Sequence, residues 1–167
     1  AKLEAREKFN QVFEKARSEF KANEADVYRQ GDNMIIRLKS MKFSSGRSDL
    51  PAASMAVLSK VKGVIGQLDS QDVVVEGHTD STGKAEVNKK LSSERASAVA
   101  DYFEADKAVG SGKIESVGFG FEKPIATNKS KVGREMNRRV DIVIKPSQTA
   151  SAVPAPAADQ APATTNQ

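Results

Sequence analysis

The sequence predicts an α/β fold, specifically an α+β two-layer sandwich in which a mixed β-sheet of about four strands packs on two long helices. Two observations indicate this fold class. Short runs rich in Val and Ile alternate along the chain with longer segments of helical periodicity, and Gly or Pro residues separate them. Such alternation is typical of βαβ units. Because only two long core helices are expected, the βαβαβ-type order favours a two-layer sandwich over a doubly wound fold.

The first 24 residues are expected to form a helix, because apolar residues recur there at three- and four-residue spacing. Two interpretations stay open, a linker helix from an upstream anchor or a helix that packs on the domain. After it, Gly31-Asp32-Asn33 is a turn signal between two short extended runs, the second of which is Met34 to Leu38. The apolar positions of the helix are Phe9, Val12, Phe13, Ala16 and Phe20.

Two further helices and a strand are expected in the middle of the chain. Pro51 is placed to begin a helix. The β-branched run Val73 to Val75 is typical of a strand buried on both faces. A longer helix covers about residues 85–106 and is ended by Gly110 and Gly112. The apolar face of the first helix is Met55, Leu58, Val61, Ile65 and Leu68, and that of the second is Val87, Leu91, Val99 and either Tyr102 or Phe103.

The last part of the chain predicts two strands and a tail. Ile114 to Phe119 indicates a strand, Pro124 to Gly133 is mostly loop with room for one short helical turn, and Val140 to Ile144 alternates as a last strand. The Ala/Pro/Thr-rich end, with Asp159 as its one charge, cannot bury enough apolar surface to offset its ordering entropy. The expected organisation is 1–24 as an N-terminal helix or linker, 25–146 as the domain and 147–167 as a disordered tail.

Composition excludes several classes of function. The chain has no cysteine, which excludes disulfides and thiolate sites, and its single histidine excludes a multi-histidine metal site. No apolar run approaches the roughly 20 residues that span a bilayer. The charged N-terminus shows no secretory signal, so an exported protein would be a mature or trimmed form. The net charge of +4 is consistent with a polyanionic partner or with an ordinary solvated surface. We expect no nucleic-acid binding, because no basic stretch of the sequence contains interleaved aromatic residues on which bases could stack.

Two stretches of the chain carry an ordered set of Gly, Asp, Asn and Arg residues. The first holds Gly77-His78-Thr79-Asp80, Gly83, Asn88, Leu91-Ser92 and Arg95-Ala96, and the second holds Gly118-Phe119-Gly120, Pro124-Ile125-Ala126, Asn128, Gly133-Arg134 and Asn137-Arg138-Arg139-Val140. Together they resemble the OmpA C-terminal-like (OmpA/Pal/MotB) peptidoglycan-binding domain family over roughly residues 34–145. The combination is specific, whereas the first four residues alone would be a weak signal. The resemblance implies an OmpA-like fold and a non-covalent cell-wall anchor.

A candidate ligand site lies where the central strand ends. Asp80 follows that strand in a loop at the carboxyl edge of the sheet, where open α/β sheets usually bind ligands. Asn88 and Arg95 are nearly two turns apart on the next helix, so they point the same way, with Ser92 between them. We therefore expect a carboxylate and a guanidinium to face one crevice. An open alternative is a structural salt bridge between Asp80 and Arg95.

Opposite charges at these two positions suit a zwitterionic ligand. Asp80 would accept from an ammonium group, and Arg95 would hold a carboxylate with a bidentate fork. The diaminopimelate of a Gram-negative peptide stem offers such a group, and the resembled family binds it. The resemblance thus implies peptidoglycan binding in the periplasm, anchoring the outer membrane or an envelope complex to the wall without any cofactor.

Two features of that assignment stay open. Outer-membrane association would use a part not in this sequence, and a homodimer is possible within the family. The alternative function is an envelope structural or protein-interaction module that uses the same fold and binds a partner through its N-terminal helix.

Further candidate contacts surround this pair. Thr79 offers its backbone amide or hydroxyl, and Asn88 offers its side-chain amide. Asn137 and Arg138 precede the last strand, where the resemblance places more contacts. Arg138 is either a second carboxylate or glycan contact or an arginine that pins a loop. The loop Ser44-Ser45-Gly46 is either a rim of the pocket or plain surface.

His78 invites a catalytic interpretation, because Asp80 and Ser92 are close in sequence and residues 78 and 80 of an extended segment point the same way. No nucleophile elbow, oxyanion-hole glycine cluster or second general acid accompanies it, so we expect a binding protein rather than an enzyme. One histidine with scattered carboxylates is also a poor transition-metal site, so we expect no metal site. We interpret His78 as a side chain that hydrogen-bonds a neighbouring loop.

Overall fold

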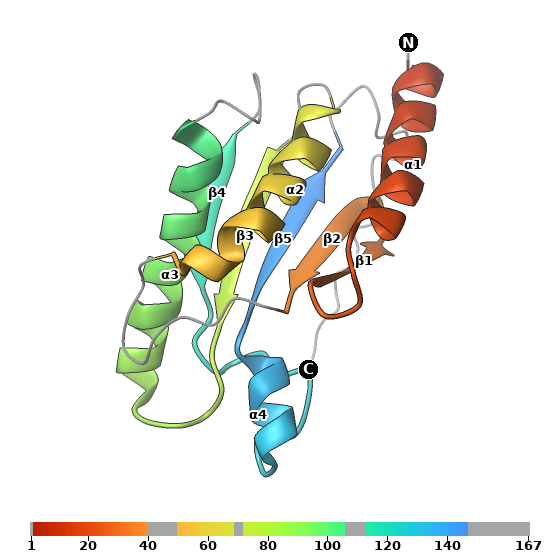
Figure 1. Ribbon diagram of the computed structural model, residues 1–167. Helices are drawn as coiled ribbons and strands as arrows, with labels where there is room; N and C mark the ends of the chain where they lie inside the picture. The colour runs from red at the N-terminus through yellow and green to blue at the C-terminus, as the bar shows by residue number, and fades with distance from the viewer. Residues whose placement is uncertain (1, 40–49, 69–71, 106–112, 147–167) are drawn as a thin grey trace, which may run out of the picture.

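The computed structural model describes residues 2–39, 50–68, 72–105 and 113–146. These residues form a β-sheet with α1, α2 and α3 on one face, while α4 lies beyond one end of the sheet (Figure 1). In chain order the elements are α1 (Lys2–Glu19), β1 (Ala25–Gln30), β2 (Asn33–Leu38), the 3₁₀ turn η1 (Ala52–Ser54), α2 (Met55–Gly66), β3 (Asp72–His78), α3 (Ala85–Ala105), β4 (Ile114–Gly118), α4 (Lys131–Asn137) and β5 (Arg139–Lys145).

Five strands form one mixed sheet in the order β1-β2-β5-β3-β4. β1 and β2 are an antiparallel hairpin, and Gly31 adopts the left-handed φ of 63° that its turn needs. β5 lies between β2 and β3 and is antiparallel to both. β3 and β4 are parallel and are joined by α3, the crossover that parallel neighbours require. The predicted fold class is confirmed, with five strands rather than about four because the run before Gly31 pairs as an edge strand.

Alternate strand residues point into one core beneath α1, α2 and α3. Ile36, Val75 and Ile142, from three neighbouring strands, are fully buried there. α1 packs its apolar face into the same core, so the second of the two interpretations of this helix, packing on the domain, describes it. The buried residues of α1 are Phe9, Val12, Phe13, Ala16 and Phe20.

The buried face of α3 differs from the predicted one. Val87 is 59% exposed, so the predicted apolar stripe is wrong at its first position. The helix backbone lies directly against strands β3 and β4. A Cβ atom added to Gly77 would lie 2.2 Å from the Ser92 carbonyl oxygen, and a Cβ atom added to Gly118 would lie 2.2 Å from the Ser93 amide nitrogen. Such a close approach leaves room mainly for small and polar side chains near the start of the helix. The buried residues of α3 are Asn88, Ser92, Ala96, Val99, Ala100 and Phe103.

α4 lies at the end of the sheet where β3 ends and β5 begins (Figure 1). This segment was expected to be mostly loop with room for one short helical turn, and a helix does begin within it, where Ser130 caps α4 by accepting a hydrogen bond from the Gly133 nitrogen at 2.9 Å. The predictions for Ser44-Ser45-Gly46, for Gly110 and Gly112, and for residues 147–167 lie outside the described residues. Among the described helices, none combines the length and hydrophobicity needed to cross a bilayer.

Candidate functional site

The loop that follows β3 holds Asp80 in a defined geometry. Its Oδ1 accepts a hydrogen bond from the Thr82 backbone nitrogen at 2.8 Å, as in an Asx turn. Thr79 donates its hydroxyl to the Asp80 carbonyl oxygen at 2.9 Å and its backbone nitrogen to the Gly120 carbonyl oxygen at 2.8 Å. The Thr82 bond therefore orients the buried carboxylate of Asp80, and the Thr79 bonds fix the backbone that carries it.

Arg138, at the end of α4, forms an ion pair with Asp80 through Nη1 and Oδ2. Burial by itself would raise the pKa of Asp80, but the hydrogen bonds from Thr82 and the interaction with Arg138 outweigh burial and lower that pKa. Asp80 is therefore ionised at neutral pH. The Arg138 side chain is still 43% exposed, so it can contact Asp80 and a ligand at the same time.

Arg95, on α3, lies within electrostatic range of Arg138. It is half-buried, and its pKa is lowered first by burial and second by the positive charge of Arg138. Arg138 thus contacts Asp80 and lies within electrostatic range of Arg95. We call Asp80, Arg95 and Arg138 the charge cluster. Asp80 follows β3 and Arg138 lies between α4 and β5, at the end of the sheet near α4 (Figure 1).

The polar face of α3 fastens the loops that surround the charge cluster. Asn88 donates its side-chain amide to the Thr82 carbonyl oxygen at 2.8 Å. The Ser92 hydroxyl donates to the Lys89 carbonyl oxygen at 3.0 Å and accepts from the Gly120 nitrogen at 2.9 Å. These bonds explain why the buried face of the helix is polar at these two positions. The predicted contact residue Asn88 therefore already has a structural role in this loop.

Asn137 is fully buried and holds the loop before α4. Its Oδ1 accepts from the Ile125 nitrogen at 2.8 Å and the Ala126 nitrogen at 3.0 Å. Its Nδ2 donates to the Ala126 carbonyl oxygen at 2.9 Å and to Asn128 Oδ1 at 2.8 Å. A side-chain amide has two donor hydrogens and two lone pairs, so none is left for a ligand. Asn128 Oδ1 also accepts from the Ser81 nitrogen at 3.3 Å, which links this loop to the one that carries Asp80.

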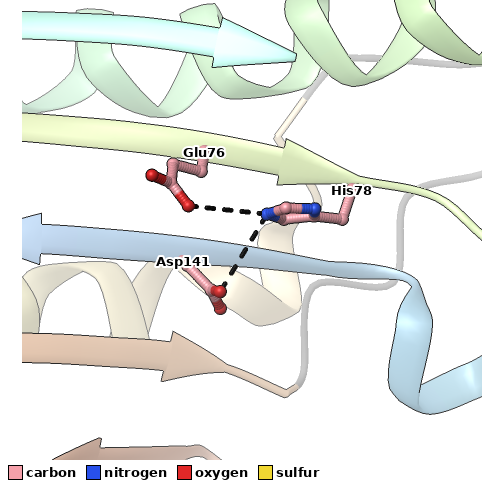
Figure 2. Close-up of side chains that lie close together, drawn as sticks. All are labelled: Glu76, His78 and Asp141. Atoms are coloured by element: carbon pink, nitrogen blue, oxygen red, sulfur yellow. Dashed lines mark ion pairs between the residues drawn. The ribbon is translucent and has the colours of Figure 1, made fainter. Parts of the chain in front are cut away.

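His78, at the end of β3, does not take the position expected of it. Its ring stacks on Phe119 with centroids 5.2 Å apart, and it lies beside Glu76 and Asp141 (Figure 2). Within the described structure, neither ring nitrogen has a hydrogen-bond partner, so the interpretation that His78 bonds a neighbouring loop is wrong. The strand alternation explains this position, because residues 76 and 78 project from the same face of β3.

Comparison with known proteins places this geometry in context. A model of the OmpA family matches residues 42–138. The probable lipoprotein YiaD of Escherichia coli is 34% identical over 133 residues, covering 79% of this chain and 60% of YiaD. The peptidoglycan-binding protein ArfA of Mycobacterium tuberculosis is 37% identical over 102 residues, covering 61% of this chain and 31% of ArfA. The chain thus spans less than two thirds of either relative.

The fold is also found among solved structures. A putative MotB-like protein from Desulfovibrio vulgaris superposes with a TM-score of 0.73 at 22% identity, covering 87% of this chain and 95% of that chain. At this identity, the likeness shows a common fold. It supports the mixed sheet with helices on one face as the architecture of this chain.

Proposed function

Because this chain belongs to the OmpA family, we propose that it binds peptidoglycan non-covalently, through the diaminopimelate of the peptide stem. The domain then anchors the outer membrane or an envelope complex to the wall from the periplasm. The relatives support this assignment, since ArfA is described as peptidoglycan-binding and YiaD as a probable lipoprotein. The family is one of binding modules, which favours an anchor over an enzyme.

The charge cluster is the observation that carries the proposal. Diaminopimelate presents an ammonium and a carboxylate on the same carbon. The Asp80 carboxylate accepts from Thr82 and Arg138, and because a carboxylate has about four lone-pair sites, it keeps acceptor capacity for a ligand ammonium. Arg95 and Arg138 are like charges close enough to affect each other, so a ligand carboxylate between them would reduce their repulsion.

The energetics of such a contact fit reversible anchoring. Charge-assisted hydrogen bonds contribute roughly 1.5–3 kcal/mol each when shielded from water. Two or three of them give about 3–9 kcal/mol, and an association cost of at least about 4 kcal/mol leaves at most about 5 kcal/mol, which corresponds to roughly submillimolar or weaker affinity from the charged contacts alone. Thr79, Asn88 and Asn137 contribute by positioning, because their hydrogen bonds orient the loops that carry the charges.

Retention on purified peptidoglycan tests the site. We expect Asp80→Ala and Arg95→Ala each to abolish co-sedimentation with diaminopimelate-type sacculi while circular dichroism stays unchanged. The matched controls are Asp101→Ala and Arg17→Ala, which remove the same side chains from exposed helix positions. Normal retention of both folded cluster variants would remove the proposed site.

Calorimetry with stem peptides tests the diaminopimelate assignment separately. Lysine in place of diaminopimelate lacks the carboxylate that Arg95 and Arg138 are proposed to hold. We expect binding to weaken by at least about tenfold, the equivalent of one lost charge-assisted bond. Equal affinity for the two peptides would refute the diaminopimelate assignment while leaving wall binding intact.

A further inference from the structure

A second cluster of polar side chains lies on the sheet face opposite the helices. Glu76 and His78 project from β3 and Asp141 from the neighbouring β5 (Figure 2), whereas the adjacent residues Val75, Val140 and Ile142 belong to the core on the other face. His78 Nε2 lies 3.6 Å from Glu76 Oε1 and 4.0 Å from Asp141 Oδ2. One ligand atom from each of the three residues lies within 4.8 Å of the other two.

The imidazole in this cluster lacks hydrogen-bond partners. Its side chain is only 2% exposed, and within the described residues both ring nitrogens are unpaired. An unsatisfied buried polar atom costs about 1–3 kcal/mol. The ring is aimed between two carboxylates that are too far away for good hydrogen bonds, so an atom placed between the three groups would satisfy Nε2 (Figure 2).

We propose that Glu76, His78 and Asp141 bind a divalent transition-metal ion of the zinc class. Imidazole nitrogen selects such ions over Mg²⁺ and Ca²⁺, which prefer sites made of oxygen ligands. In tetrahedral zinc sites, metal–ligand distances near 2.0–2.1 Å place neighbouring ligand atoms about 3.3 Å apart. The observed 3.6 and 4.0 Å are slightly wider. Glu76 is 27% exposed, so its side chain can move inward and a water molecule can complete the coordination.

Two arginines set the expected strength of the site. Arg37 donates to both Asp141 oxygens at 3.0 and 3.1 Å, and Arg139 donates to Oδ2 at 3.3 Å. These guanidiniums hold the carboxylate in place without an ion, and they compete with an ion for it. We therefore expect weaker binding than at a structural zinc site, with selectivity that comes from the imidazole.

The composition of the chain makes the test specific. The protein contains one histidine and no cysteine, so His78 is the single imidazole or thiolate available to a metal ion. The metal-free chain of 167 residues is titrated with ZnCl₂ by calorimetry, and with Co²⁺ by visible absorption, which reports low-coordinate binding. We expect one site that is lost in His78→Ala, is weakened at least about tenfold in Glu76→Gln, and gives no heat with MgCl₂.

A matched control addresses non-specific binding to acidic groups. Glu115→Gln removes an exposed carboxylate from the adjacent strand β4, opposite Val74, and is expected to leave zinc affinity unchanged. Zinc also raises the melting temperature of the parent protein but not of the His78 variant, if it binds the folded state through this ring. If His78→Ala does not fold, the zinc affinity of Glu76→Gln tests the site instead, because the Glu76 side chain is partly exposed. Absence of zinc binding, or equal zinc affinity in the Glu76 and Glu115 variants, overturns the site.

Discussion

The tight contact between α3 and the sheet gives a sharp prediction for Gly118→Ala. Gly118 lies at the end of β4, and no left-handed φ is involved, so alanine changes the space rather than the backbone preference. The added Cβ would lie 2.2 Å from the Ser93 nitrogen and 2.6 Å from the Ser92 Oγ. Ordinary contacts between such atoms are about 3.5–4.0 Å. The helix must therefore shift by about 1 Å or more, because its backbone cannot rotate away as a side chain would.

The magnitude follows from the atoms that clash. Overpacking of a well-packed interior costs about 1–3 kcal/mol and occasionally more. The contact at Gly118 is with helix backbone, so we expect the upper end, about 3 kcal/mol. For a domain of this size, that corresponds to a fall in the melting temperature of about 10 °C. The shift also moves Ser92, whose hydroxyl accepts from Gly120, and so loosens the loop over Asp80.

Thermal unfolding followed by circular dichroism measures this effect. The matched control is Gly63→Ala, because a Cβ atom at Gly63 in α2 meets nothing within 4 Å. The same substitution there should be neutral or stabilise by up to about 1 kcal/mol, since alanine is the better helix former. The close-approach argument would be refuted if Gly118→Ala melts within about 1 °C of the parent protein, or if Gly118→Ala and Gly63→Ala change the melting temperature equally.

Two further outcomes follow from the loops around the site. Asn137→Ala should lower the free energy of unfolding by about 2–3 kcal/mol in urea, because this fully buried side chain accepts from the Ile125 and Ala126 nitrogens and both bonds are lost. The control Asn10→Ala removes one exposed contact, with Arg29, and should cost no more than about 1 kcal/mol. Equal effects of the two substitutions would contradict the loop-holding role of Asn137. The pKa of Asp80 is lower in the folded state, so its contribution to stability is present above the unfolded pKa of about 3.9 and is lost as the pH falls through the folded pKa. Asp80→Asn should therefore flatten the pH dependence of the melting temperature below about pH 4. Parallel curves of melting temperature against pH for the parent and the variant would argue against this contribution.

The local elements could be predicted because each carries its own periodicity. The hairpin around Gly31 follows directly from local sequence. The apolar face of α2 was predicted correctly at Leu58, Val61 and Ile65, but wrongly at its first position, since Met55 is 38% exposed. The central position of β5 does not follow from local sequence, because strand pairing depends on contacts between segments far apart in the chain. The predicted buried face of α3 was wrong at Val87, because hydrophobic periodicity expects Val rather than Asn or Ser at buried positions. The glycines on β3 and β4, rather than hydrophobicity, decide which side of that helix is buried.

The positions of Asp80 and Arg95 relative to the strands and helices could be predicted from the sequence, but the partner of Asp80 could not. Asp80 follows a buried strand, which is a local signal, and Arg95 lies on the next helix. The partner of Asp80 depends on how α4 folds back, and α4 has little helical signal in the sequence. The saturated amide of Asn137 is likewise visible only once the loop at Ile125 is built around it.

The separation of His78 from Asp80 shows why spacing alone can mislead at a strand end. Residues two apart on an extended strand share a face, which would place these side chains together. β3 ends at His78, however, and the turn that follows directs the Asp80 carboxylate to Thr82 and Arg138. The rule holds only while the strand continues, so Glu76 rather than Asp80 becomes the neighbour of His78. Two polar residues of one short motif therefore belong to different clusters, and the proposed wall-binding and metal-binding roles rest on separate side chains.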